Sequence, residues 1–548
     1  MQHILEKPSS QRGDAKTRQP LLRLAWRVFP MWGMCLVIGC IALAFNLYRL
    51  GAPSIWFDEV LSVERARQSL PVLWQIIFST QPNMALYYIV LHFWLAFIHL
   101  FGLLPTEFVV RFPSAVFAAC SAIMLWLLGR RFLGNIAGLV GTILYILNFQ
   151  QLIYAQDTRS YSMQLLLLAI AWYAFFAALS AESHQKRWWI VYSLVSVLAV
   201  YTHVFSLLIL FTQAIVFACL LILPTPWRGS VRKQFLPAIV TAFATCILLI
   251  PILLVSLHGG RTEWLPVPDL NDAVHVLLYV GNGNRPYLLL VGVLCMLGVV
   301  GVVIAWLPGV AARIPILADE QKTARLRSLF PVTFALVCWC VVPFILSYVI
   351  SQGQTHLFSS RYLVVIVPPL LLLAGLGVGV IGDLGWRRVQ IGLVPLAVII
   401  ASLVVPLYYQ SAEVENWRDA AFWIQQQYQS GDGMTCYNND QGCQISIDYY
   451  FRTYPKKGIS FPTDAPGSFS WVTYDLTNDP GVPNDATDTK ALASYGAKHQ
   501  RVFYIVGRLD GDDDVARVQN AQRWLDSHYH FVKQVTTSTV TVRLYETR

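Results

Sequence analysis

Long apolar segments recur along most of this chain, and short polar segments separate them. A helix of roughly 20 apolar residues crosses the core of a lipid bilayer. Segments near that length lie at 31–48, 109–128, 132–150, 163–180, 188–202, 204–223, 235–257, 286–307, 329–350, 362–382 and 391–409. The pattern predicts a polytopic α-helical membrane protein with about eleven transmembrane helices.

A further apolar stretch, 83–102, is predicted not to cross, because a crossing there would move every later loop to the other side. Without it, Lys and Arg concentrate in alternate loops, such as those at 130–131 and 387–388, as expected of cytoplasmic loops. We therefore predict a re-entrant or interfacial helix at 83–102. Residues 59–79 have an amphipathic, interfacial pattern, so the first extracytoplasmic loop, 49–108, is expected to lie along the membrane.

Composition and charge agree with this fold class. The chain is 56% hydrophobic and 13% charged, with a mean hydropathy of +0.52, whereas a soluble domain carries about 25% charged residues. Basic cytoplasmic loops account for the net charge of +9, and no basic run with interleaved aromatics indicates nucleic-acid binding. Residues 1–30 are basic and precede an apolar segment too long for a signal peptide, so a cytoplasmic N-terminus and an uncleaved anchor are predicted.

Beyond residue 410 the chain becomes polar and rich in Asp, Gly and Thr. Asn416 is placed to cap a helix that runs through Gln427, and the segments 502–506 and 535–545 have strand patterns. Residues 411–548 are therefore predicted to form a small extracytoplasmic α/β domain. Since that compartment is oxidising, a disulfide between Cys436 and Cys443 is expected.

Acidic residues mark the loops of the extracytoplasmic side. Asp58 and Glu59 follow the first apolar segment, and Asp157 and Arg159 follow the third crossing. Carboxylates at the ends of membrane helices are costly to place and indicate a functional site. The same side holds further polar candidates: Gln81, Asn83, Tyr87, Tyr88, His92, Tyr161, His203, Arg261, His275, His356, Arg361 and Tyr362.

These residue types combine two kinds of chemistry. A carboxylate can deprotonate a hydroxyl group, and arginine can bind a phosphate through two hydrogen bonds. The set suits transfer from a lipid phosphate to a hydroxyl acceptor, and no P-loop or dinucleotide-binding glycine motif indicates a nucleotide donor. The alternatives are a polytopic transporter or lipid flippase, although no internal repeat is found, and a membrane assembly scaffold.

Simpler roles are also open for these residues. Asp58 and Glu59 can cap the helix that begins there, and Asp157 can form an interfacial ion pair with Arg159. Glycines at 375 and 379 have the spacing of helix packing in membranes.

Several segments, in this order and on one side, resemble the membrane-embedded GT-C glycosyltransferases, in particular the bacterial branch related to protein mannosyltransferases and aminoarabinose transferases. The segments are Trp56–Glu59, Pro82–Tyr88 leading to His92, Arg111–Ser114, Tyr154–Tyr161, Ser360–Tyr362 and Asn416–Ala421. The resemblance covers most of residues 50–430 and says little about the sugar.

The resemblance implies a catalytic domain at 31–410 in a bacterial inner or plasma membrane. Its donor would be a polyprenyl-phosphate-linked sugar, and its acceptor a hydroxyl of a lipid, glycan or protein. Asp58 would be the general base and Asp157 the second catalytic carboxylate. The implied substrate-binding residues are Glu59, Asn83, Tyr87, Tyr88, His92, Arg159, Tyr161, Arg261, Arg361 and Tyr362.

One segment departs from the family pattern. Many relatives have a His-Pro-Pro-like segment where this chain has Gln81-Pro82-Asn83. A neutral Gln removes a good metal ligand, which puts metal dependence in doubt. A divalent cation held by Asp58, Glu59 and Asp157 stays possible.

Overall fold

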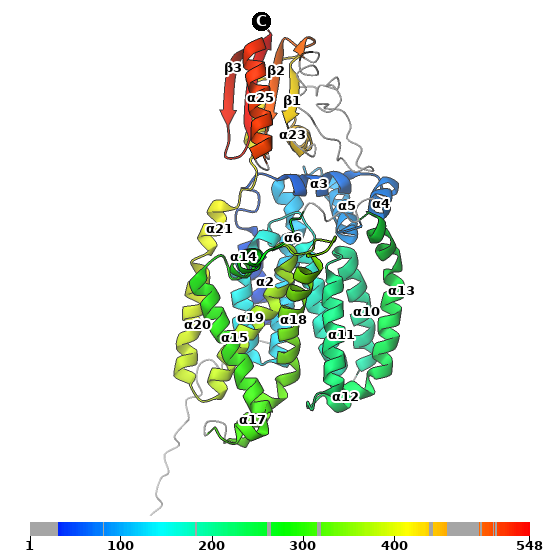
Figure 1. Cartoon of the computed structure of the whole chain (residues 1–548), viewed down its shortest axis with the longest axis vertical. Helices are drawn as coiled ribbons and strands as arrows, with labels where there is room; N and C mark the ends of the chain where they lie inside the picture. Colours follow the sequence, from blue (N-terminus) through cyan, green and yellow to red (C-terminus); the bar gives the residue numbers. More distant parts are fainter. Residues whose placement is uncertain are drawn as a thin grey trace, which may run out of the picture.

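The computed structural model describes residues 31–79, 82–180, 184–259, 265–314, 319–437, 442–456, 496–507 and 512–547, with positions 493 and 509. A bundle of long helices forms one part, and a small α/β domain stands on one end of it (Figure 1). That end, uppermost in Figure 1, is called the upper end below.

The bundle follows the apolar pattern of the sequence. Its main helices are α2 (Met31–Leu47), α6 (Glu107–Phe132), α7 (Asn135–Ile146), α8 (Phe149–Ala155), α9 (Tyr161–Leu179), α10 (Gln185–Thr202), α11 (Ser206–Ile222), α13 (Phe235–Gly259), α15 (Arg285–Trp306), α18 (Phe330–Ile350), η2 (Tyr362–Ile366) with α19 (Val367–Asp383), α20 (Arg387–Ser402) and α21 (Val405–Ser411). Short helices connect them: α12 (Arg228–Lys233), α14 (Leu270–Val280), α16 (Pro308–Ala311) and α17 (Glu320–Ser328).

Within the described residues, seven helices are long and apolar enough to cross a membrane, or eight if the bent pair α7 and α8 is one span. A helix lies at each of the other predicted crossings, but α2 and α11 have only 17 residues each. The larger count therefore stays a prediction. The predicted single helix at 132–150 is wrong, because α7 and α8 meet at an angle of 61° and Asn148 caps α8 by accepting hydrogen bonds from the amides of Gln150 and Gln151.

Burial separates central helices from peripheral ones. Most of the apolar window is buried in α9 (83%) and in the helix Tyr362–Asp383 (89%), but only 17% of it is buried in α13. On α13, large apolar side chains such as Leu236 and Phe243 are exposed, as in a helix that faces lipid.

Glycines let α19 approach its neighbours closely. A Cβ atom on Gly375 would lie 2.2 Å from the carbonyl oxygen of Ala137 on α7, and one on Gly377 would lie 1.9 Å from that of Leu294 on α15. At Gly379 the nearest atom would be Cβ of Ala137 at 3.6 Å, an ordinary van der Waals distance. Both glycines therefore pack against α7, as predicted, but only Gly375 leaves no room for a side chain.

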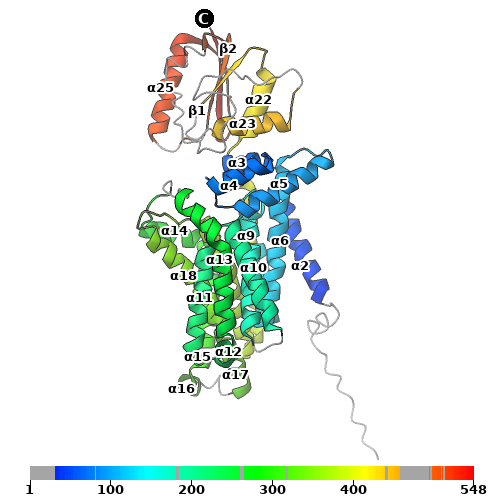
Figure 2. The same ribbon diagram turned by 90° about the vertical axis from the view of Figure 1, so that its right-hand side faces the viewer.

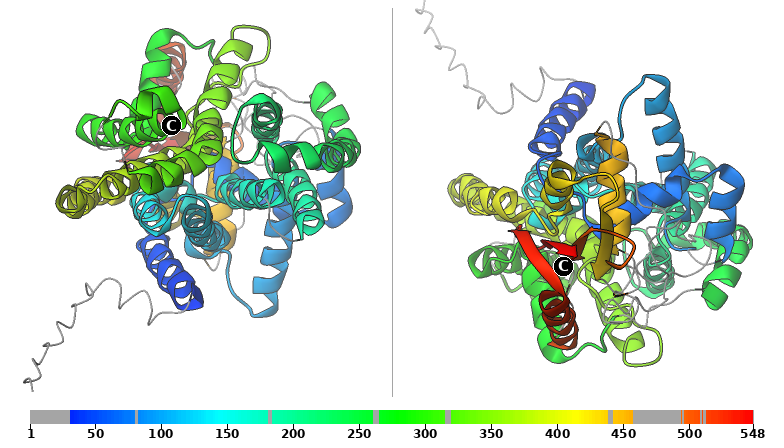
Figure 3. Two further views of the ribbon diagram at one scale, coloured as in Figure 1. Left: turned by 90° about the horizontal axis from the view of Figure 1, so that it is seen from below. Right: turned by 90° about the horizontal axis from the view of Figure 1, so that it is seen from above.

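Three helices form a layer between the bundle and the α/β domain: α3 (Phe57–Arg67), α4 (Leu70–Ser79) and α5 (Ala85–Leu100). Figures 2 and 3 show that α5 runs across the upper end rather than along the bundle. It has 16 residues and does not qualify as a span. The stretch 83–102 thus contains a short transverse helix, and its re-entrant or interfacial place in a membrane stays a prediction.

The C-terminal part has a four-stranded sheet of order β1-β2-β4-β3, in which β1 (Gly433–Tyr437) is parallel to β2 (Arg501–Val506) and the other pairs are antiparallel. Its helices are α22 (Trp417–Gln427), α23 (Gly442–Thr453) and α25 (Asp512–His528). The predicted helix is correct, and Asn416 caps it through the amide of Asp419. The predicted strand at 502–506 is correct within one residue.

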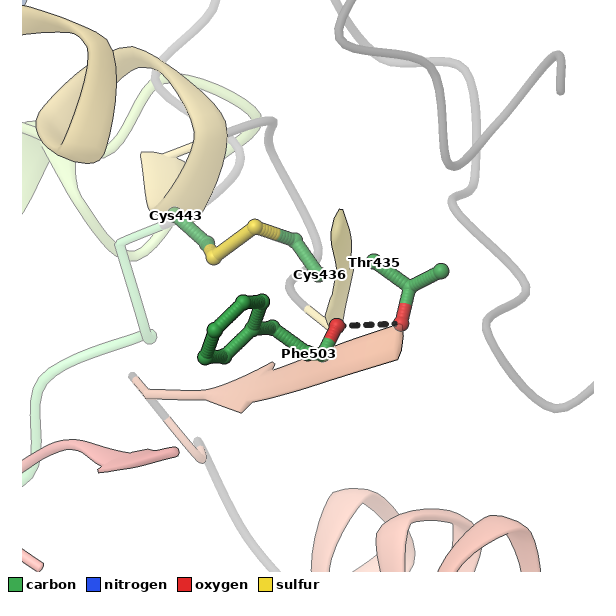
Figure 4. Close-up of a disulfide and its surroundings, with 4 residues drawn as sticks. All are labelled: Thr435, Cys436, Cys443 and Phe503. Carbon is green, nitrogen blue, oxygen red and sulfur yellow. Dashed lines mark hydrogen bonds between the residues drawn. A yellow bond between two sulfur atoms is a disulfide. The ribbon is translucent and has the colours of Figure 1, made fainter. Parts of the chain in front are cut away.

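The second predicted strand, 535–545, is wrong. It is a hairpin of β3 (Tyr529–Thr536) and β4 (Thr541–Thr547). The polar residues between them form a turn in which the amide of Thr537 donates to the carbonyl of Val540 over 2.8 Å. Alternation of Thr with apolar residues continues through this turn and conceals it in the sequence. The expected disulfide joins Cys436 on β1 to Cys443 on α23 (Figure 4). Beside it, the hydroxyl of Thr435 donates a hydrogen bond to the carbonyl of Phe503.

Candidate functional site

Asp58 lies in the first turn of α3 at the upper end and faces two arginines from distant parts of the chain. Its Oδ2 atom is 3.1 Å from Nη1 of Arg361 and 3.6 Å from Nη2 of Arg159. Nη1 of Arg159 also donates to the backbone carbonyl of Asp58 over 3.2 Å. The Asp58 side chain is about one-fifth exposed, so it is held by protein groups and still open on one side.

Glu59, the other acidic residue of the pair, has a different environment. It is fully buried, and its two oxygens accept hydrogen bonds from Nε and Nη2 of Arg111 over 2.8 and 2.6 Å. Oε1 also accepts from the amide of Thr158 over 2.8 Å, and Oε2 from the amide of Trp56 over 3.5 Å. Glu59 therefore joins the two acidic loops and caps α3, and the expected substrate contact of Glu59 stays a prediction.

Asp157 is buried next to this pair. Its Oδ1 accepts a hydrogen bond from the indole of Trp56 over 3.3 Å. Burial, reinforced by the negative charge of Glu59, raises the pKa of Asp157 from 3.8 to about 8, against the opposing effect of Arg159. Near neutral pH this carboxyl therefore favours its protonated form, in which it can also donate a hydrogen bond.

Arg361 completes the group from the loop before η2. Its guanidinium carbon lies 5.0 Å from the ring centre of Trp56, a cation–π distance, and its side chain is 40% exposed. The next residue, Tyr362, belongs to a group of three rings with His203 and Tyr161. The ring centroid of His203 lies 5.0 Å from that of Tyr362 and 5.5 Å from that of Tyr161. The structure thus brings together the predicted residues Asp58, Asp157, Arg159, Tyr161, Arg361 and Tyr362.

His203, predicted only as a further polar candidate, lies in the same place. It is buried, and its Nδ1 atom accepts a hydrogen bond from the amide of Phe205 over 3.3 Å, which leaves the proton of the neutral ring on Nε2. Burial and the charge of Arg159 lower the pKa of His203 to about 3. Nε2 of His203 has no hydrogen-bond partner among the described residues, and the same holds for Thr158 Oγ1, Arg159 Nε and Ser160 Oγ.

The other predicted binding residues make contacts inside the protein. Oδ1 of Asn83 accepts from the amide of Val204, the hydroxyls of Tyr87 and Ser114 bond to each other, the hydroxyl of Tyr88 accepts from Arg65, and Nδ1 of His92 bonds to the carbonyl of Ala66. These bonds fix the layer of α3 and α5. Gln81 and Arg261 lie outside the described residues.

The carboxylates do not form a metal site. No group of three or more His, Cys, Asp or Glu side chains that could hold a metal ion occurs among the residues the structure describes. Glu59 directs both oxygens at Arg111, and Oδ2 of Asp58 faces Arg159 and Arg361, so a cation at these oxygens would lie next to positively charged side chains. The cation suggested by the sequence does not fit this arrangement.

Comparisons with known proteins give the following matches. Residues 83–254 match the family model described as "Dolichyl-phosphate-mannose-protein mannosyltransferase". No curated protein matches the chain by sequence. Among solved structures, ArnT from Cupriavidus metallidurans in the apo state aligns with a TM-score of 0.56 and 11% identity over 95% of this chain and 98% of ArnT. The same protein bound to undecaprenyl phosphate aligns with a TM-score of 0.54 and 11% identity, over 93% and 98%.

Proposed function

We propose that this chain, which has the GT-C glycosyltransferase fold, transfers a sugar from a polyprenyl-phosphate donor to a hydroxyl acceptor with Asp58 as general base. One observation carries the proposal: the partly exposed carboxylate of Asp58 lies between Arg159 and Arg361 beside the buried Asp157. The site has a base and cationic groups in one place at the end of a membrane helix bundle.

The reaction is a single displacement at the anomeric carbon. The acceptor hydroxyl oxygen forms a bond to that carbon, and its proton moves to the carboxylate of Asp58. The bond between the anomeric carbon and the phosphate oxygen breaks, and polyprenyl phosphate leaves with the electron pair. Attack and departure on opposite sides invert the configuration. A positioned carboxylate contributes about 10²- to 10⁴-fold to such a step.

Arg361 is suited to the negative charge of the leaving phosphate. Its guanidinium has five N–H donors, and its one hydrogen bond to a described side chain is that to Asp58. Because the Arg361 side chain is partly exposed, a phosphate can reach its other N–H donors. The hydroxyl of the neighbouring Tyr362 is a further donor. Groups placed where charge develops stabilise the transition state more than the ground state. ArnT, in the structure with the similar fold, binds undecaprenyl phosphate, which supports this donor class.

Residues around Arg159 fit recognition of a polar ligand. Burial without a hydrogen-bond partner is unfavourable for a polar atom, by about 1–3 kcal/mol. The partnerless atoms of Thr158, Ser160 and His203 lie on segments that border Arg159 and Tyr161. Sugar hydroxyls offer the donors and acceptors that these atoms lack. We place this transfer at the extracytoplasmic face of a bacterial cell membrane, with a lipid, glycan or protein as acceptor.

Replacement of Asp58 tests the proposal directly. The Asp58→Asn variant keeps the size of the side chain and removes the base, so transfer from synthetic polyprenyl-phospho-sugars should fall about 10²-fold or more. Asp526→Asn, in the α/β domain, is the matched control and should transfer at the parental rate. Full turnover by a folded Asp58→Asn variant would refute the role of the base. Mass spectrometry of co-purified lipids should detect a polyprenyl-phosphate species.

A further inference from the structure

The loop at 50–56 leads directly into Asp58 but has no helix or strand of its own. Its backbone amides and carbonyls must find partners elsewhere, because buried backbone groups without hydrogen bonds are unfavourable. Some of these partners are local, such as the carbonyl of Arg49 for the amide of Ala52 and Glu59 for the amide of Trp56. Most of the others are side chains from two separate parts of the protein. One part is the helix bundle, and the other is the C-terminal α/β domain with the segment that leads to it.

A side chain of the helix bundle donates hydrogen bonds to the carbonyl groups of this loop. Arg111 on α6 donates to the carbonyls of Leu50, Pro53 and Ser54 over 3.0, 2.8 and 3.0 Å. The same guanidinium pairs with Glu59, so it fixes the loop relative to the first turn of α3.

Three residues in or next to the C-terminal domain accept hydrogen bonds from backbone amides between residues 54 and 57. Oε1 of Glu413 accepts from the amide of Ser54 over 3.3 Å, and the hydroxyl of Tyr450 accepts from that of Ile55 over 2.8 Å. Oε2 of Glu415 accepts from the amide of Phe57 over 2.9 Å. Phe57 is the first residue of α3 and precedes Asp58, and a carboxylate is favourable at this positive end of a helix.

Arg418 on α22 adds two more carbonyl contacts. Its guanidinium donates to the carbonyls of Gly51 and Ala52 and pairs with the buried Glu107 at the start of α6 over 3.1 Å. Oε1 of Glu107 also accepts from the hydroxyl of Tyr450 over 3.0 Å. The C-terminal domain is therefore bonded both to the loop and to the helix beside it.

We infer that the C-terminal domain is a positioning element of the catalytic site, which holds the 50–56 loop through Tyr450 and the first residue of α3 through Glu415 and thereby sets the place of Asp58. This inference rests on the proposed role of Asp58. Glu415 and Tyr450 do not contact the Asp58 carboxylate in any of these bonds. They act through the backbone, by fixing the first residue of α3 and the loop before it.

Hydrogen exchange of the full-length protein in detergent tests the hold on the loop without any substrate. Glu415→Ala removes the acceptor of Phe57, and Tyr450→Phe removes that of Ile55. Each variant should raise amide exchange in peptides that cover 50–57, since an amide without its acceptor opens more often. Tyr545→Phe is the control, because Tyr545 is equally buried in the same domain and its hydroxyl bonds to Asp526 instead. Unchanged exchange in both test variants would overturn the inference.

Transfer kinetics test the consequence for the site. Misplacement of a catalytic group by about 1 Å lowers turnover about 10²-fold, so kcat of Glu415→Ala and Tyr450→Phe should fall tenfold to 10²-fold with KM for the donor nearly unchanged. Glu415→Gln keeps an oxygen that can accept from Phe57 and should restore most of kcat. Parental kcat in variants with raised exchange would overturn the positioning role. Full activity of Asp58→Asn would instead overturn the proposed function, a result that the exchange data distinguish.

Discussion

The buried pair of Glu59 and Arg111 gives the sharpest prediction of stability. Both side chains are almost fully inaccessible, at 1% and 3% exposure, and two hydrogen bonds of 2.8 and 2.6 Å join them. Removal of one partner from such a pair leaves an uncompensated buried charge and costs about 3–5 kcal/mol. Arg111→Met and Glu59→Gln should each destabilise the protein by an amount in this range.

The two single variants should differ in a defined direction. Arg111→Met also removes three donors from the 50–56 loop, whereas Glu59→Gln keeps an oxygen that can accept from the amide of Thr158. Arg111→Met should therefore be the more destabilised variant. In the double variant no buried charge is left alone, so its destabilisation should be smaller than the sum of the two by about 0.5–3 kcal/mol.

Unfolding in mixed detergent micelles, followed by circular dichroism, gives the four free energies of this double-mutant cycle. The reference variant is Arg325→Met, because Arg325 pairs with Asp383 while its own side chain is 59% exposed, and exposed pairs contribute little. Additive effects in the cycle, or a loss below about 1 kcal/mol for Arg111→Met, would show that Glu59 and Arg111 do not hold the two acidic loops together.

Three further predictions follow from the site and the bundle. The pKa of Asp157 is raised from 3.8 to about 8, so between these pH values the folded chain binds a proton that the unfolded chain lacks. The stability that this group contributes is complete below about pH 4 and is lost as the pH rises through 8. The free energy of unfolding of Asp157→Asn should therefore lack this decline with pH. An equal decline in that variant would contradict the assignment. Arg361→Lys loses the planar donor pair and should raise KM for the donor about tenfold, equivalent to about 1.4 kcal/mol, while Arg325→Lys keeps the parental KM; equal KM values would exclude phosphate binding by Arg361. Gly375→Ala should lower the thermal midpoint of unfolding, because its Cβ would meet a backbone oxygen at 2.2 Å, and Gly379→Ala should leave it unchanged because its nearest neighbour lies at 3.6 Å; equal midpoints would contradict this account.

The sequence predicts the helix bundle well, because apolar runs of the required length are a local property. It does not reveal the bend between α7 and α8, which depends on the cap at Asn148 inside a run that otherwise looks continuous. This bend sets the position of the loop that carries Asp157. The hairpin of β3 and β4 is hidden for a similar reason, since the Thr-rich alternation continues through the turn.

The site was predictable as far as charge and order along the chain allow. Asp58, Asp157 with Arg159, and Arg361 come from three separate segments of the chain, and the count of crossings alone predicts that they share one side of the membrane. The environment of each residue was not predictable. Glu59 and Asp58 are neighbours in sequence, yet one is buried against Arg111 and the other is partly exposed, because successive helical residues point in different directions.

The bonds between the 50–56 loop and the C-terminal domain have a consequence for biogenesis. Phe57 and Glu415 are 358 residues apart, and a ribosome that adds about 5–20 residues per second needs roughly 20–70 seconds to make that stretch. During this interval the loop before Asp58 is already synthesised while its amide partners are not. A nascent or truncated chain that ends at residue 412 would contain every bundle helix through α21 and both acidic loops, but would lack the acceptors for the amides of Ser54, Ile55 and Phe57. If Asp58 has the proposed role, the site should therefore be complete only after the C-terminal domain has been made.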